Sequence, residues 1–147
     1  MSAHILCTFK SRKMEWWYAF ITLGFGIWLG LPQDAMATRA YTQLVGWMPE
    51  DDWAKMFGLT GLIHLLALYI NGSRWWTPLL RFTVLVINAL AYAIISAGFW
   101  AFYWPTTATY TYAAISIGGM ICVYAAAWDA THAVRVAYSA LRAYYAD

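Results

Sequence analysis

The sequence predicts an all-α, polytopic membrane protein with four transmembrane helices in an antiparallel bundle. Of its 147 residues, 63% are hydrophobic and only 11% are charged. A soluble domain carries about 25% charged residues, so this chain has too few to give a globule a hydrated surface. Two further observations complete the prediction: four long apolar stretches, and loops whose basic residues alternate from side to side.

Basic residues predict how the chain is threaded. Of the nine Lys and Arg residues, only Arg39 and Lys55 flank the apolar stretches on one side. The other side holds the remaining seven, namely Lys10, Arg12, Lys13, Arg74, Arg81, Arg135 and Arg142. Basic residues close to transmembrane helices stay in the cytoplasm. We therefore expect both the N-terminus and the C-terminus to be cytoplasmic.

Four stretches are suited to cross a bilayer, and together they make residues 1–147 a single transmembrane domain. They cover residues 15–31, 53–70, 78–104 and 110–128. A helix needs about 20 residues to cross a core that is about 30 Å thick. Pro32 and Pro105 end the first and third stretches, because proline cannot continue a helix. Helices are expected because lipid cannot satisfy the open edges of a sheet.

The first stretch has a second interpretation, as a cleaved signal peptide. A basic segment, residues 10–13, precedes an apolar run, and Ala35-Met36-Ala37 resembles a cleavage site. The run is long and is flanked by tryptophans, which favours a retained transmembrane helix.

Tryptophans support these boundaries, because amphipathic rings prefer the headgroup layer of a membrane. None of the ten tryptophans falls at the centre of a stretch. The residues that we expect to anchor the helix ends are Trp16, Trp17, Trp53, Trp75, Trp76, Trp104 and Trp128.

Two segments outside the four stretches are expected to be helical. Residues 33–47 carry apolar side chains four apart, including Met36 and Leu44, which predicts a short amphipathic helix on the outer surface. Acidic residues 50–52 follow it and suit the start of the next helix. Residues 129–145 form a basic helical tail, either an extension of the fourth helix or an anchor for anionic lipid or a partner.

Small residues at every fourth position predict how the helices pack. Lipid is as apolar as a protein core, so association depends on close backbone approach. The series are Ala89, Ala93, Ala97 and Ala101, then Ala114, Gly118, Cys122 and Ala126, and in the first stretch Gly26 and Gly30. The third and fourth helices either pack on each other or present one series to a second copy. In both cases, Gly118→Leu is expected to harm the fold or the assembly.

Polar side chains inside the stretches mark candidate functional positions. His64 lies well inside the second stretch, and Arg81 and Asn88 lie at similar depth in the third. A neutral His64 could link the two helices by hydrogen bonding to Asn88. The alternative is that His64 is part of a proton or ion pathway. Arg81 is expected to reach back to the headgroups. Haem ligation at His64 is disfavoured, because His132 and His4 do not match its depth.

Other classes of function lack support. The chain has no nucleophile elbow, phosphate loop or paired histidine–carboxylate metal spacing, so we expect no enzyme activity, cofactor or small-molecule substrate. Its net charge of +2 and lack of a basic stripe disfavour nucleic acid. Cys7 and Cys122 are expected to lie in different environments and to form no disulfide.

The chain resembles a group of small four-span membrane proteins encoded in tailed-phage genomes. The residues that carry the resemblance, over most of the chain, are Glu15-Trp16, Met48-Pro49-Glu50-Asp51, Trp53, Gly58, Gly61, Leu68, Ile70-Asn71-Gly72, Pro78, Arg81 and Trp128-Asp129-Ala130. The resemblance implies a viral origin and a host-membrane location, and it supplies no catalytic residues.

Three hypotheses follow for function. The first is a phage protein that oligomerises in the host cytoplasmic membrane and alters permeability or passage, as in holin-like action, superinfection exclusion or genome delivery. The second is a structural or accessory subunit of a larger membrane or virion complex. The third is a proton-translocating, ion-translocating or haem-binding subunit centred on His64.

Overall fold

The chain forms a set of packed helices. The computed structural model describes residues 12–32, 34–37, 39–70, 76–103 and 106–144, and its regular elements there are all helical. In chain order they are α2 (Lys13–Leu29), the 3-10 helix η1 (Arg39–Tyr41), α3 (Thr42–Trp47), α4 (Glu50–Ile70), α5 (Thr77–Tyr103) and α6 (Thr107–Tyr144). The predicted all-α class is confirmed.

Three helices are long and apolar enough to cross a membrane. These segments are Glu50–Ile70, Thr77–Ala101 and Thr107–Val136. Large apolar side chains on their outer faces, such as Leu62, Leu90 and Ile121, are exposed. This surface fits contact with lipid tails and supports the predicted membrane protein. Helix α2 has 17 residues, somewhat fewer than the ~20 that a full crossing needs.

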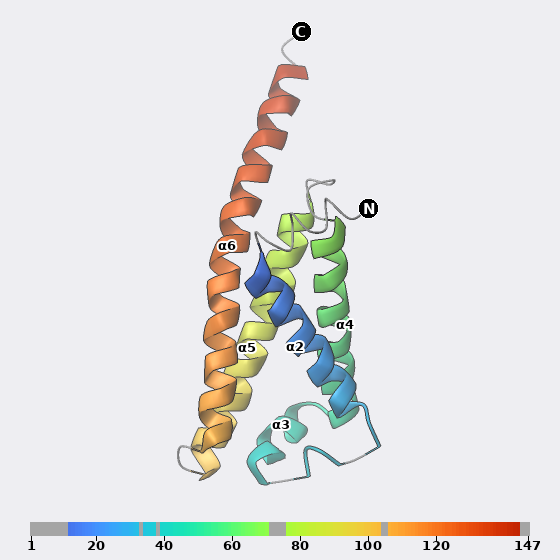
Figure 1. Ribbon diagram of the computed structural model, residues 1–147, viewed down its shortest axis with the longest axis vertical. Coiled ribbons are helices and arrows are strands. Elements are labelled where there is room, and N and C mark those ends of the chain that lie inside the picture. Colours follow the sequence, from blue (N-terminus) through green and yellow to red (C-terminus); the bar gives the residue numbers. More distant parts are fainter. Residues whose placement is uncertain (1–11, 33, 38, 71–75, 104–105, 145–147) are drawn as a thin grey trace.

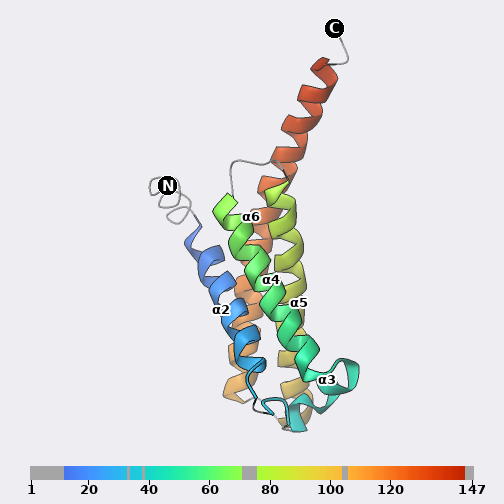
Figure 2. The same ribbon diagram turned by 90° about the vertical axis from the view of Figure 1, so that its right-hand side faces the viewer.

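The four long helices lie side by side. In Figure 1, α2 and α5 run from the upper end to the lower end, whereas α4 and α6 run upward. Figure 2 shows the same arrangement from the side. Helix α5 packs chiefly against α6, and α2 packs chiefly against α4. The start of α2 and the end of α6 lie toward the upper end, whereas α3 lies at the lower end.

The helix bounds lie close to the expected ones, except at the C-terminal end. The fourth predicted stretch and the tail form one continuous helix, α6, which has 38 residues. At 1.5 Å per residue, α6 is about 57 Å long and exceeds a hydrocarbon core of about 30 Å. Figure 1 shows α6 projecting past the other helices at the upper end. Of the two interpretations of the tail, the extension of the fourth helix describes the fold.

Glycines bring α2 and α4 into backbone contact. A methyl group on Gly26 would collide with the backbone of Gly58, and one on Gly61 would lie 2.5 Å from the backbone nitrogen of Leu23. Gly30 is looser, because its nearest side chain, Ala54, lies 3.9 Å from the same methyl position. Gly26 therefore has the predicted packing role, and the glycines of α4 add to it.

Only part of the predicted series is buried between the helices. Ala89, Cys122 and Ala126 are buried, whereas Ala97, Ala101 and Ala114 are exposed and Ala93 is half-buried. Ser116 donates a hydrogen bond to the Ala89 carbonyl (2.9 Å), and Ser96 donates one to the Thr109 carbonyl (2.9 Å).

Gly118 has no role in this contact, contrary to the packing expectation. A methyl group on Gly118 would meet nothing within 4 Å. The neighbouring Gly119 is the close-packed residue, because its added methyl would lie 2.5 Å from the Tyr18 hydroxyl of α2. The difference comes from the rotation of α6 by one residue, about 100°, which residue spacing alone does not define.

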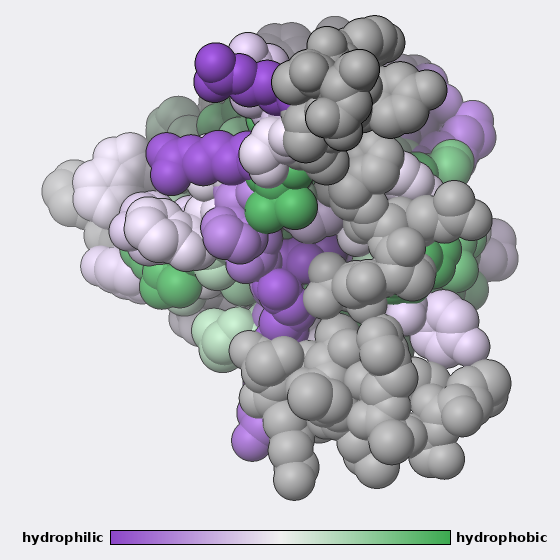
Figure 3. Space-filling model, turned by 90° about the horizontal axis from the view of Figure 1, so that it is seen from above, coloured by the Kyte–Doolittle hydropathy of each residue, from purple (hydrophilic) through white to green (hydrophobic). Residues whose placement is uncertain are grey.

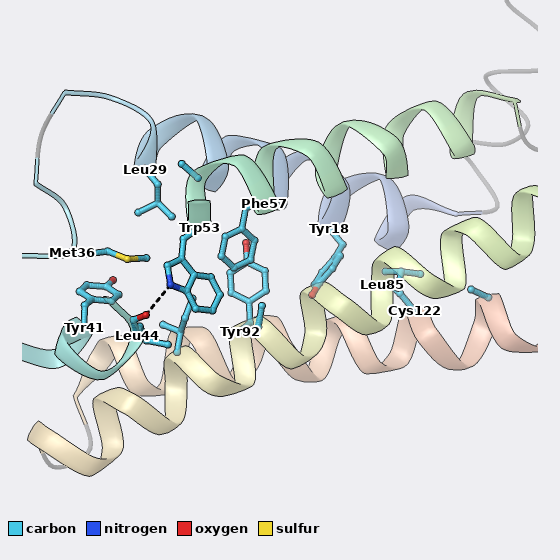
Figure 4. Close-up of a cluster of buried hydrophobic side chains, with 14 residues drawn as sticks. Tyr18, Leu29, Met36, Tyr41, Leu44, Trp53, Phe57, Leu85, Tyr92 and Cys122 are labelled. Atoms are coloured by element: carbon cyan, nitrogen blue, oxygen red, sulfur yellow. Dashed lines mark hydrogen bonds between the residues drawn. The ribbon is translucent and has the colours of Figure 1, made fainter. Parts of the chain in front are cut away.

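The loop between α2 and α4 is not the predicted surface helix over residues 33–47. Among the described residues of this loop, η1 and the six-residue α3 are the helical parts. The buried side chains of Met36, Tyr41 and Leu44 close the lower end of the core. Figure 4 shows Met36, Tyr41 and Leu44 next to Trp53. The apolar residues of this loop are therefore buried one by one instead of lining one face of a helix. Part of the loop backbone forms hydrogen bonds with side chains of α4 in place of bonds within a longer helix.

Two side chains of α4 hold this loop. Glu50 accepts hydrogen bonds from the backbone N–H groups of Ala35 (3.0 Å) and Met36 (3.1 Å), so its carboxylate closes the loop as well as starting α4. Trp53 donates its Nε1–H to the Leu44 carbonyl (3.1 Å), as Figure 4 shows. Trp53 is only 5% exposed and is therefore a core residue, contrary to the predicted anchoring role at the membrane surface.

An aromatic cluster fills the centre of the core. Phe57 and Tyr92 have ring centroids 5.1 Å apart, and Phe25 lies edge-on to Phe57 at 5.0 Å. Tyr18 packs edge-on to Tyr92 at 6.1 Å. Figure 4 shows Phe57 and Tyr92 between the Trp53 group and Tyr18. Each such pair contributes about 0.5–1.5 kcal/mol beyond the burial of area.

Candidate functional site

Charged side chains from α2, α5 and α6, and from the residue directly before α2, meet inside the upper half of the molecule. They are Glu15, in the first turn of α2, Arg81, in the second turn of α5, Asp129 of α6, and Arg12, directly before α2. Arg81 is 0% exposed and Glu15 is 4% exposed. We call these four residues the ionic cluster.

Arg81 and Glu15 form the centre of the ionic cluster. Arg81 donates Nε–H to Oε2 of Glu15 (2.9 Å) and an Nη2 hydrogen to Oε1 (3.2 Å). This two-point geometry suits the planar guanidinium group and gives both strength and orientation. Because Glu15 lies in the first turn of α2, its negative charge also interacts favourably with the positive end of the helix dipole.

Asp129 and Arg12 complete the ionic cluster from the side nearer to solvent. Asp129 Oδ2 accepts hydrogen bonds from Arg81 Nη2 (2.9 Å) and from Arg12 Nη1 (2.5 Å). Arg12 Nη1 also lies 3.1 Å from Glu15 Oε1. Burial lowers the pKa of Arg12, but its hydrogen bond to Asp129 and the charge of Glu15 outweigh this and raise that pKa above its ordinary value.

The charges of the ionic cluster balance. Two guanidinium groups face two carboxylates, and each carboxylate contacts both arginines. A buried charge that lacks a partner costs several kcal/mol, so pairing is what allows Arg81 and Glu15 to lie inside the helices. The ionic cluster thereby ties α2, α5 and α6 together at one level. Hydrophilic side chains gather around this end of the molecule when it is seen from above (Figure 3).

His64 of α4 adjoins the ionic cluster on its deeper side. The imidazole is 0% exposed, and its Nε2 lies 3.7 Å from Glu15 Oε2. That distance brings the two groups into electrostatic contact but is longer than a hydrogen bond. Within the described residues, neither ring nitrogen has a hydrogen-bond partner. His64 therefore faces α2, rather than linking α4 to α5.

More polar groups lie deeper along the same helices. Asn88 of α5 is fully buried, and its Oδ1 accepts a hydrogen bond from Thr60 (2.8 Å), which is one turn from His64 on α4. Among the described residues, the Asn88 side-chain nitrogen and the hydroxyl groups of Tyr18 and Tyr92 have no hydrogen-bond partner. The interior beyond the ionic cluster is therefore polar at several points.

Two interpretations of the polar residues were wrong. Arg81 does not extend to the membrane surface, because the carboxylates of α2 and α6 lie at its own level and pair with it. Asn88 pairs with Thr60 and not with His64, because the imidazole is turned toward Glu15.

The carboxylates were missed as members of the site. Glu15 and Asp129 each lie near the predicted end of a stretch, which suggested a surface position. A retrospective signal exists: each is a lone acid beside a tryptophan at the same predicted membrane level as Arg81.

Several predicted residues do not contribute to the ionic cluster. Trp17, Trp76 and Trp128 are exposed and Trp16 is half-buried, whereas Trp75 and Trp104 lie outside the described residues. His132 is exposed, so it does not share the pocket of His64, and His4 lies outside the described part. In the described part of the chain, no group of three or more His, Cys, Asp or Glu side chains could hold a metal ion.

Comparison of this chain with protein-family models, curated proteins and solved structures finds no match.

Proposed function

We propose that the protein crosses a bacterial cytoplasmic membrane four times as an antiparallel bundle, with both termini in the cytoplasm. Three of the crossings are the helices α4, α5 and α6, which have the necessary length and apolar character. Helix α2 is proposed as the fourth. Exposed Trp17 and Trp28 lie near its two ends, and the headgroup layer suits such rings.

Contacts of α2 support its inclusion. The Gly26–Gly58 approach and the Gly61–Leu23 approach place it directly on α4, and Glu15 pairs with Arg81 of α5. A cleaved signal peptide has no reason to supply a buried ion-pair partner for a distant helix. The 17 residues of α2 cover about 26 Å, which a modest local thinning of the bilayer accommodates.

In this membrane, we propose a non-enzymatic role in which copies of the chain associate and alter permeability or passage. The observation that carries association is the lower half of α6. There Ala114 is exposed, Gly118 faces open space, and Ile117 and Ile121 flank them with large apolar surfaces. In lipid, small residues between larger ones allow two helices to approach closely. The phage resemblance makes holin-like action, superinfection exclusion or genome delivery the expected setting.

Labelling of single cysteines tests the topology. In a variant in which Ser replaces Cys7 and Ala replaces Cys122, we would introduce Lys13→Cys, Val45→Cys or Ser139→Cys. A membrane-impermeant maleimide added to spheroplasts is expected to label the Val45 position only, and to label the other two after lysis. Labelling of Lys13→Cys and Ser139→Cys from opposite sides would refute an even number of crossings.

Crosslinking tests association. Ala114→Cys and Gly118→Cys, in the same cysteine-free variant, are expected to form disulfide-linked dimers in membranes. Ala126→Cys is the control, because Ala126 is fully buried within one chain and cannot reach a second copy. Expression of the active protein is expected to lower the membrane potential of the host cell. Equal crosslinking at all three positions would argue against a specific contact through this face.

A second candidate is an accessory subunit of a larger complex, and the projecting part of α6 favours it. Val134, Val136 and Tyr138 are exposed there, close to the basic residues Arg135 and Arg142. A mixed apolar and basic helix of this kind can bind a partner protein or anionic lipid. Co-purification of one defined partner with the intact chain, and its loss when residues 134–147 are deleted, would favour this role over self-association.

A further inference from the structure

Among the described residues, the two oxygens of the Glu15 carboxylate are used unequally. A carboxylate offers about four lone-pair sites. Oε1 accepts hydrogen bonds from Arg12 and Arg81, whereas Oε2 accepts one from the described residues, from Arg81 Nε. Oε2 is also the oxygen that lies 3.7 Å from His64 Nε2. A protonated imidazole could therefore donate to Oε2 without displacing any existing hydrogen bond.

A continuous series of polar contacts leads from solvent to this point. The side chains of Asp129 and Arg12 are 30% and 21% exposed, and they contact each other. Arg12 contacts Glu15, and Glu15 faces the fully buried imidazole. The two carboxylates in this series can each accept a proton, while the arginines keep their charge. Charged and hydrogen-bonding side chains therefore extend from the solution at the upper end to the position of His64.

Because the charges of the ionic cluster balance, the uptake of one proton by His64 changes the net charge of this region by one unit. With a neutral imidazole, the ionic cluster of two arginines and two carboxylates has no net charge. One added proton gives a net charge of +1, and the nearest counter-charge is Glu15. Histidine is the side chain whose ordinary pKa lies within the physiological range, so it is suited to this step.

Further polar groups are buried along the helices that carry Glu15, His64 and Arg81. The nitrogen of Asn88 and the hydroxyl groups of Tyr18 and Tyr92 are buried and, among the described residues, have no hydrogen-bond partner. Buried groups of this kind are usually satisfied by protein or ordered water. They therefore add donors and acceptors deeper along the same helices.

We propose that His64 and Glu15 form a proton-binding site inside the helices, on the side of the molecule where Asp129 and Arg12 meet solvent. A hydronium ion transfers its proton to the ring nitrogen of His64 that carries the lone pair, so that one O–H bond breaks, one N–H bond forms and a water molecule leaves; the Nε2–H of the imidazolium then faces Glu15 Oε2. No other covalent bond forms or breaks. The site requires only one copy of the chain, so it does not depend on the proposed self-association.

The groups that decide this equilibrium come from every element around His64. Glu15 and Asp129 favour the imidazolium, whereas Arg12 and Arg81 oppose it. Tyr18 of α2 stays neutral as a phenol below its ordinary pKa of about 10 and contributes no charge. Loss of the Glu15 charge leaves two arginines opposed only by Asp129, so it must shift proton uptake by His64 to lower pH.

Nuclear magnetic resonance of the full-length protein, labelled with ¹⁵N only in histidine, tests the proposal in lipid nanodiscs. The chain has three histidines, and His64→Gln and His132→Gln assign the signals. In the unaltered protein, we expect the His64 ring signals to move with pH between 5 and 8. Constant His64 signals across that range would overturn the proposal without recourse to any variant.

Two variants complete the test. Glu15→Gln keeps the shape of the side chain and is expected to move the His64 transition to lower pH. Glu50→Gln is the matched control, because Glu50 is bound to the loop at the lower end, and it is expected to leave the transition in place. If Glu15→Gln folds, as shown by an unchanged circular dichroism spectrum, and the transition does not move, Glu15 is not the partner and the proposal fails.

Discussion

Gly26 shows how one missing side chain permits the contact between α2 and α4. A methyl group there would meet the backbone of Gly58, which cannot rotate away as a side chain can. Gly24 lies on a different face of α2, and a methyl group added there would meet nothing within 4 Å. The two glycines therefore differ in packing while sharing helix and sequence context.

Gly26→Ala is expected to destabilise the protein by about 1–3 kcal/mol, because α2 must move away from α4 to relieve the overlap. Gly24→Ala is expected to be neutral or stabilising by up to about 1 kcal/mol, because alanine favours the helix. Thermal unfolding in a mild detergent measures both. Equal effects of the two substitutions would show that the close approach does not stabilise the fold.

Arg81 is expected to stabilise the fold through its two carboxylate partners. Arg81→Met removes the only described contact of α5 with both carboxylates, leaving Glu15 and Asp129 paired with Arg12 alone. Breaking a buried ion pair typically costs about 3–5 kcal/mol, and we expect a loss in that range. Arg81→Lys is expected to recover part of it, since lysine keeps the charge without the two-point geometry.

Arg135→Met is the control for this change, because Arg135 is exposed on the projecting part of α6. Its unfolding temperature is expected to stay within error of that of the unaltered protein. If Arg81→Met also has no effect on detergent unfolding, the ionic cluster is not a source of stability.

The position of Arg81 also shows what the sequence can predict about a single residue. Residue spacing predicted its depth, one turn into α5, but depth fits both a surface arginine and a buried one. The choice depends on whether carboxylates of other helices face it, and that depends on how each helix is rotated. The same reason explains why Gly118 was expected in a close helix contact, whereas Gly119 is the residue that packs closely, against Tyr18 of α2.

At the scale of elements, Glu50 connects a loop to a helix. Its two oxygens accept the backbone N–H groups of Ala35 and Met36, and the buried Tyr41 donates or accepts a hydrogen bond at Tyr112 of α6 (2.9 Å). Burial is the larger cause that raises the pKa of Tyr41, and this hydrogen bond is the next. The hydroxyl group therefore keeps its proton at physiological pH. The loop is therefore held at two points on different helices.

Glu50→Gln is expected to loosen the loop, because the amide oxygen can replace only one of the two acceptors and has no charge. Arg39 is exposed in η1, so trypsin cleavage after this residue reports loop opening. We expect cleavage to become several-fold faster, because hydrogen bonds to a charged group contribute about 1.5–3 kcal/mol. Asp51→Asn, at the exposed neighbouring position, is expected to leave the rate unchanged.

The sequence predicted elements unevenly, for a physical reason. Long apolar stretches bounded by Pro32 and Pro105 predicted α2, α4, α5 and the start of α6 within a few residues. The loop was mispredicted, since Met36 and Leu44 fit a helix face equally well when they are separately buried by a folded loop. Only the tertiary contacts of Glu50 and Trp53 distinguish the two cases.

At the scale of the whole molecule, α6 serves two surfaces at once. The face with Cys122 and Ala126 packs inside the structure, whereas the face with Ala114 and Gly118 is open. If the chain associates as proposed, its own stability and its association depend on adjacent residues of one helix. This separation allows the two properties to be altered one at a time.

Gly118→Leu and Gly119→Leu are the matched pair for this test. Gly118→Leu is expected to leave the unfolding temperature unchanged or slightly raised, since leucine meets no neighbour within the chain and favours the helix. It is expected to weaken association, because the larger side chain holds two helices apart. Gly119→Leu is expected to destabilise the single chain, because its side chain overlaps the buried Tyr18.

Thermal unfolding and native mass spectrometry of the same detergent samples separate these effects, and Val123→Leu serves as a volume control on the half-buried flank of α6. A smaller oligomer with an unchanged unfolding temperature for Gly118→Leu is the outcome that fits self-association through this face. If Gly118→Leu unfolds at lower temperature and keeps the oligomer of the unaltered chain, this face packs within one chain. The open surface would then have to serve contact with lipid or with a different partner.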